Sequence, residues 1–175
     1  MQKTGVAGFS LVEIFISMLM VAIAVSGIIK WQVANIYAAR QTEASANAMR
    51  LASELADWIR ALPQEFSIHN NPYIFQIFHQ APTNPVISCF YSHCNPSEQI
   101  EFDLLEWHQR LLSALPGARV EVCRDDQSWN AQMLAWSCKV TQETSAPLVI
   151  KIGWYRPASA EVMPQLALAV GSVAP

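Results

Sequence analysis

The chain has 175 residues, which suffices for one folded domain plus an anchoring segment but not for two ordinary domains. Charged residues make up only 14% of the sequence and hydrophobic ones 52%, with the apolar excess concentrated at the N-terminus. The formal net charge of −3 gives no polybasic signature, which argues against nucleic-acid binding driven by bulk attraction to phosphate.

The first feature along the chain is an apolar run from Phe9 to Ile29, which is about the ~20 residues needed to span a bilayer core. Glu13 lies near its start with no basic residue beside it. A carboxylate inside a bilayer costs on the order of 2.5–3.5 kcal/mol, so Glu13 needs an explanation.

Three interpretations of this run are open. A cleaved secretory signal is weakly supported by Lys3 and by a small-residue site around Ala24, and a plain single-pass anchor fits by length. Both leave Glu13 unexplained. In the third interpretation, cleavage between Gly8 and Phe9 creates an α-amine four residues before Glu13, on the same helix face. The amine and the carboxylate then pair within one chain or between neighbouring chains.

The helix is predicted to continue beyond Lys30, because the next residues are rich in Ala, Arg, Glu and Leu and lack Pro and Gly. Pro63 ends it. We therefore expect a transmembrane and assembly helix over 9–30 and an amphipathic continuation over 31–62. A stripe at helical spacing is predicted to face a core: Leu51, Leu55, Trp58, Ile59 and Leu62.

Residues 63–175 are predicted to form a globular head. Recurrent prolines indicate loops from residue 64 to about 100, with short apolar islands such as residues 73–78, and a second helix is expected over 101–117. Strand-like runs follow at 119–123, 136–142 and 148–156, with a weaker one at 165–170. Alternation of Ile150 and Ile152 around Lys151 favours a sheet with one wet face. The predicted fold is α+β: a long N-terminal helix packed on a small antiparallel sheet that ends in a β-meander.

All four cysteines follow the apolar segment, which favours disulfides in an oxidising compartment. Four cysteines allow three pairings, and proximity favours Cys89–Cys94 and Cys123–Cys138. Cys89, His93 and Cys94 invite a zinc site, but a structural site would need a second close ligand pair. Cys89 and Cys94 are also too far apart for a C-x-x-C redox motif.

No catalytic constellation is evident, because the four histidines, His69, His79, His93 and His108, lack a nucleophile or carboxylate at a suitable spacing. No Gly-rich phosphate loop occurs either. We therefore expect a non-enzymatic protein with no cofactor, no metal and no small-molecule substrate.

The N-terminal residues carry a resemblance. MQKTGVAG followed by FSLVEI resembles the class III leader of type IV pilins and pseudopilins, with Gly8, Phe9 and Glu13 matching one for one. The resemblance implies the pilin fold, a leader peptide over residues 1–8, cleavage by prepilin peptidase at Gly8–Phe9, and N-methylation of Phe9. It also implies that Glu13 docks against the amine of an adjacent subunit. Unlike many major pilins, this chain has no Pro between Phe9 and Leu62, so Gly27 is the expected soft point.

A second, looser pattern resembles the PilV-type minor pilins, at Asp103, Trp107, Leu111, Leu115, Pro116, Gly117 and Trp154. It implies a minor subunit of a type IV pilus that serves pilus assembly or priming and pilus-dependent twitching motility or adhesion. The implied partners are the inner membrane, prepilin peptidase, other minor pilins and the major pilin. The implied location is a single-pass inner-membrane protein with a periplasmic C-terminal domain, and then the extracellular filament. The alternatives are a minor pseudopilin of a type II secretion system or a non-polymerising, membrane-anchored periplasmic binding domain.

Overall fold

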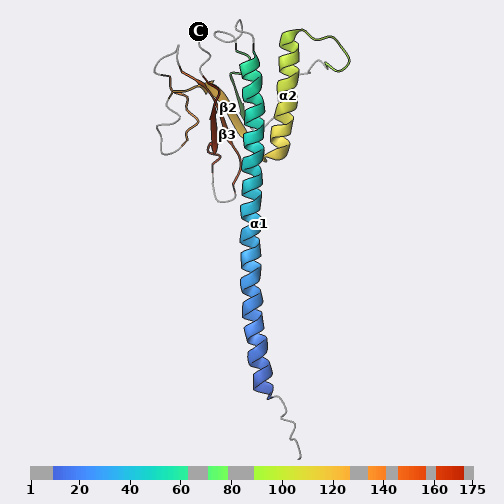
Figure 1. The fold of residues 1–175 in the computed structure, drawn as a ribbon, viewed down its shortest axis with the longest axis vertical. Helices are drawn as coiled ribbons and strands as arrows, with labels where there is room; N and C mark the ends of the chain where they lie inside the picture. The colour runs from blue at the N-terminus through green and yellow to red at the C-terminus, as the bar shows by residue number, and fades with distance from the viewer. Residues whose placement is uncertain are drawn as a thin grey trace, which may run out of the picture. The chain divides into compact units, whose positions relative to one another are not determined.

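The computed structural model describes residues 10–62, 71–78, 89–126, 134–140, 146–156 and 161–171. Along the chain the elements are α1 (Leu11–Ala61), β1 (Phe75–Phe78), α2 (Pro96–Ala114), β2 (Arg119–Arg124), β3 (Leu148–Gly153) and β4 (Leu166–Ala169) (Figure 1). The chain divides into two compact units, residues 1–43 and residues 44–175. The predicted α+β layout, with a long N-terminal helix and a small antiparallel sheet, is confirmed.

Helix α1 runs from Leu11 to Ala61 without interruption, close to the predicted bounds of 9 and 62. The helix contains no Pro, so every residue beyond its first turn can donate a main-chain hydrogen bond. Gly27 lies inside the helix. A Cβ added at Gly27 would meet no atom within 4 Å, so the glycine is not required by close packing in this chain.

The sheet belongs to the second unit and has the strand order β1-β2-β3-β4, with every neighbouring pair antiparallel. The β2–β3 register places Val120 opposite Ile152 and Val122 opposite Ile150. Because side chains alternate between the two faces of a strand, these four residues share one face, which we call the core face. We call the opposite face, which carries Glu121 and Lys151, the outer face.

Two strand predictions were wrong. The apolar island at residues 73–78, predicted as loop, contains β1, which pairs with β2 as an edge strand. The run at 136–142 was predicted as a strand, but residues 136–140 form none, and residues 141–142 lie outside the described part. The carbonyl oxygens of Ala135 and Ser137 bind the side chain of Lys151 rather than a neighbouring strand.

Helix α2 begins five residues earlier than predicted because Asn95 caps it. The Asn95 side chain accepts a hydrogen bond from the Glu98 main-chain N–H (2.9 Å), and the Glu98 carboxylate accepts one from the Asn95 N–H (2.8 Å). Pro96 occupies the first turn, where its missing N–H costs nothing. Gly117 follows the helix with a φ of 66°, a conformation that glycine adopts without steric cost.

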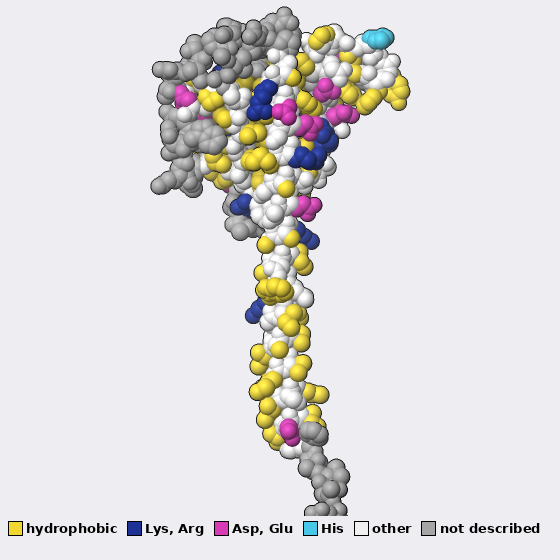
Figure 2. All heavy atoms as spheres, in the orientation of Figure 1, with side chains coloured by type: hydrophobic (Ala, Val, Ile, Leu, Met, Phe, Trp, Pro, Cys, Tyr) yellow, Lys and Arg dark blue, Asp and Glu magenta, His cyan; other side chains and the backbone are white. Residues whose placement is uncertain are grey.

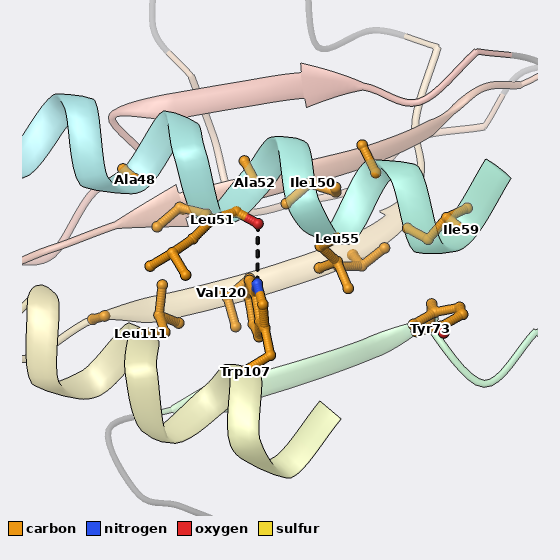
Figure 3. Close-up of a cluster of buried hydrophobic side chains, with 14 of the residues drawn as sticks. Ala48, Leu51, Ala52, Leu55, Ile59, Tyr73, Trp107, Leu111, Val120 and Ile150 are labelled. Carbon is orange, nitrogen blue, oxygen red and sulfur yellow. Dashed lines mark hydrogen bonds between the residues drawn. The ribbon is translucent and has the colours of Figure 1, made fainter. Parts of the chain in front are cut away.

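The core of the second unit lies between the core face of the sheet and both helices (Figure 3). Helix α1 contributes a buried stripe that includes Leu51, Leu55 and Ile59, as predicted, while Trp58 and Leu62 pack against it partly buried. Helix α2 contributes Trp107 and Leu111, and the sheet contributes Val120, Val122, Leu148, Ile150 and Ile152. The two helices therefore cover one face of the sheet.

Along β3, the outer face is not the wet face that the sequence predicted. All six residues of β3 are buried, and Lys151 is only 1% exposed. Residues 134–140 contact this face through Lys151, which explains why alternation of apolar and charged residues did not mean exposure to water.

Candidate functional site: the apolar part of helix α1

The apolar residues at the start of helix α1 are exposed in the isolated chain. Every described residue from Leu11 to Ile29 is solvent-exposed, and Phe15, Met18 and Met20 are each at least 65% exposed. Figure 2 shows hydrophobic side chains over the visible face of this part of the helix. An unpartnered apolar surface of this extent indicates contact with lipid or with other proteins.

By length and composition, α1 is the one helix among the described residues that could cross a membrane, a property it shares with signal sequences. An α-helix satisfies its main-chain hydrogen bonds internally, as the apolar part of a bilayer requires. The transmembrane prediction for 9–30 is supported to that extent.

Glu13 lies in the first turn of α1, where a carboxylate interacts favourably with the helix dipole. Its main-chain N–H donates to the Ser10 carbonyl oxygen (3.0 Å). No described residue forms a hydrogen bond or an ion pair with the Glu13 carboxylate. Its neighbours in the sequence, Leu11, Val12 and Ile14, are all apolar. Gly8 and Phe9, the predicted cleavage and N-methylation residues, lie outside the described part of the chain.

The hydroxyl groups in the apolar part have partners on their own helix, which the sequence did not reveal. Ser17 donates to the Ile14 carbonyl oxygen and Ser26 donates to that of Ile23, each at 2.8 Å. A hydroxyl satisfied in this way can enter an apolar environment at little cost. Glu13 is thus the only ionisable residue between Ser10 and Ile29, and the serines do not provide a partner for it.

A shallow groove follows one side of the apolar part, lined by Ser17, Val21, Ala22, Val25 and Ser26 among others. Small residues on one helix face allow the main chain of a second helix to approach closely in a membrane. The groove is therefore suited to packing against another helix.

The four cysteines form two disulfide bonds, Cys89–Cys94 and Cys123–Cys138, which is the pairing that proximity favoured. Cys123 lies in β2, and Cys138 lies in the connection between β2 and β3. Within the described residues, Glu121, Cys123 and Cys138 are close enough to share a metal ion. The disulfide engages both sulfurs, so these cysteines offer no thiolate for a metal while it is intact.

Of the histidines, His93 is exposed near the start of α2, His108 is buried in α2, and His69 and His79 lie outside the described part. Among the described residues, neither ring nitrogen of His108 has a hydrogen-bond partner, and burial lowers the pKa of its imidazole. In the part of the chain that the structure describes, neither His93 nor His108 forms a hydrogen bond with a serine, threonine or cysteine side chain.

Two polar features of the second unit were missed from the sequence. Lys151 and Asp125, 1% and 3% exposed in their side chains, form an ion pair of 2.6 Å on the outer face. Arg110 of α2 makes two hydrogen bonds to the Glu54 carboxylate of α1, at 2.6 and 2.9 Å. Both pairs join residues far apart in the sequence, and no local pattern indicates either.

No protein-family model, curated protein or solved structure matches this chain.

Proposed function

We propose that this chain is a minor pilin. It is made as a prepilin in the inner membrane with its C-terminal head in the periplasm, and prepilin peptidase cuts it between Gly8 and Phe9. After N-methylation of Phe9, the subunit joins other minor pilins and the major pilin in an extracellular type IV pilus. The observation that carries the proposal is the position of Glu13: a carboxylate with no partner among the described residues, in the first turn of an exposed apolar helix and four residues after Phe9.

Cleavage at Gly8–Phe9 provides a counter-charge for Glu13. Before cleavage, Glu13 is an acid in an apolar segment without a described partner. Cleavage supplies an α-amine one helical turn away, and an ion pair between subunits cancels both charges at a fixed height along the helices. That pairing sets the register of one subunit against the next.

The apolar surface accounts for the two environments that a pilin occupies. In the membrane, lipid covers the exposed side chains from Leu11 to Ile29. In the filament, neighbouring helices cover them, and the groove beside Ser17 and Ser26 suits close helix packing. The globular head then determines which partners the subunit selects, and its two disulfides fit an oxidising compartment.

The deciding experiment is the mass of the N-terminal peptide of protein extracted from its native membrane, with a strain lacking prepilin peptidase as the control. We expect a peptide that begins with N-methylated Phe9 in the first strain and with Met1 in the second. A mature chain beginning at Met1 or at Gly27 would overturn the proposal and leave a plain anchor or a secreted domain.

N-terminal processing does not separate a pilus from a type II secretion system, since both use the same leader chemistry. The proteins that co-purify with this chain in sheared filaments distinguish the two machines. We expect the chain to co-purify with pilus subunits; co-purification with secretion-channel proteins instead would assign it to the secretion machine.

A further inference from the structure

Residues 134–140, which we call the latch segment, contact the outer face of the sheet. Glu121 and Lys151 are directly paired on that face in the β2–β3 register. The described latch segment forms no strand, so no ladder of main-chain hydrogen bonds holds it to the sheet. Its attachment therefore depends on individual contacts.

The central contact involves Lys151. Its ammonium group donates to the carbonyl oxygens of Ala135 (3.0 Å) and Ser137 (2.9 Å) and lies 2.6 Å from the Asp125 carboxylate. The Cys138 sulfur lies 3.9 Å from the same ammonium group. Three of these four partners belong to the latch segment, so Lys151 stays both buried and satisfied only while the segment is in place.

Other contacts seat the latch segment around Trp136. The Trp136 indole N–H donates to the Val162 carbonyl oxygen (2.8 Å), and the Arg119 guanidinium lies 4.1 Å from the centre of its ring. Gly153 leaves room for this ring, since a Cβ there would lie 2.8 Å from Trp136 Cζ2. The only described covalent link from the segment to the sheet is Cys138–Cys123.

We propose that the Cys123–Cys138 disulfide is a redox latch. In the oxidised chain it holds the latch segment over the outer face and keeps Lys151 buried. When the bond is reduced, the segment leaves, Lys151 becomes hydrated, and the core between the helices and the core face remains folded. The latch works in the same way whether or not the chain is a pilin.

The chemistry is a thiol–disulfide exchange. To close the latch, the two thiols lose two electrons and two protons to a disulfide oxidant, which becomes a pair of thiols; a dithiol reverses the reaction. The head therefore acquires its closed outer surface only in an oxidising compartment, and a reduced chain presents a different surface to its partners.

Amine acetylation of the full chain in detergent, read by peptide mass spectrometry, tests the latch. Lys30 is exposed, belongs to the first compact unit and serves as the internal reference. We expect Lys151 to react at least about tenfold faster, relative to Lys30, after phosphine reduction or in Cys123→Ser/Cys138→Ser, because local opening exposes it. Cys89→Ser/Cys94→Ser is the matched control and leaves Lys151 protected.

Two results would overturn the inference. Lys151 that stays protected after reduction would show that the non-covalent contacts hold the latch segment without the disulfide. The second result comes from hydrogen exchange at the α1 amides of Leu51–Ile59. Loss of their protection on reduction would mean global unfolding rather than a local opening.

Discussion

The Trp107 indole N–H donates a hydrogen bond to the main-chain carbonyl oxygen of Leu51 over 3.0 Å, although the two residues are 56 positions apart (Figure 3). Both residues are fully buried. The bond ties α2 to the buried stripe of α1, and Phe75 from β1 forms a T-shaped ring pair with the same indole. One side chain thus joins both helices and the edge of the sheet.

Trp107→Phe should lower the free energy of unfolding of the head by about 1–3 kcal/mol, through loss of the hydrogen bond and of buried ring volume. Urea denaturation followed by far-UV circular dichroism measures the change. Trp31→Phe, at a position of α1 that is 67% exposed and lies just after the apolar part, is the matched control and should leave head stability unchanged. Equal stability of the wild type and Trp107→Phe would contradict the role given to the bond.

Arg110→Gln should cost the head about 0.2–1 kcal/mol at low salt, because the Arg110–Glu54 pair is bidentate but partly exposed. Most of this difference should vanish at about 1 M salt, where the Debye length shrinks to ~3 Å. Arg60→Gln breaks the more exposed Asp57 pair within α1 and should have a smaller effect. A salt-independent loss in Arg110→Gln would point to lost packing instead of lost charge.

The stability of the head should depend on pH through His108. Burial lowers the folded-state pKa of this imidazole below the ordinary value of 6.5, so the unfolded state binds more protons in the interval between the two values. The contribution of neutral His108 to the free energy of unfolding is fully present above pH 6.5. It falls as the pH drops toward the folded-state pKa, by at most ~1.4 kcal/mol per pH unit for one proton. His108→Gln should remove this slope, whereas His93→Gln, at an exposed position, should retain it. An unchanged slope in His108→Gln would assign the pH dependence to other groups.

Gly153→Ala should destabilise the head by about 1–3 kcal/mol, a typical cost of overpacking. Its Cβ would clash with the Met163 carbonyl oxygen and lie 2.8 Å from Trp136 Cζ2, and main chain cannot yield as a flexible side chain does. Thermal unfolding of the oxidised chain measures the effect. Gly27→Ala, where the added Cβ meets nothing within 4 Å, is the control and should leave the melting temperature of the head unchanged.

The elements that sequence analysis located correctly have a local cause. Helix α1 follows from a long run of helix formers without Pro, and its buried stripe follows from the spacing of Leu51, Leu55 and Ile59. Strands β2 and β3 follow from alternation, and the two disulfides join the cysteines nearest in sequence. None of these needs knowledge of distant partners.

The features that the sequence missed depend on distant partners. Strand β1 exists because β2, more than forty residues later in the chain, pairs with it and is its only neighbour among the described strands. Lys151 is indistinguishable from a solvated strand residue until Asp125 and the carbonyl groups of the latch segment are placed around it. Within residues 10–62 the Glu13 carboxylate has no partner, and we propose that its partner is the Phe9 amine of another subunit.

Glu13→Ala should leave cleavage intact but reduce incorporation into filaments by at least about tenfold, since the Phe9 amine of a neighbour would then be buried without a counter-charge. Quantitative immunoblotting of sheared filaments gives the incorporated fraction, and the N-terminal peptide mass confirms cleavage at Gly8–Phe9. Glu43→Ala removes an exposed acid from the same helix outside the apolar part and is the matched control. Normal incorporation of Glu13→Ala would remove the ion pair from the mechanism, whereas equal losses in both variants would indicate a general requirement for helix charge.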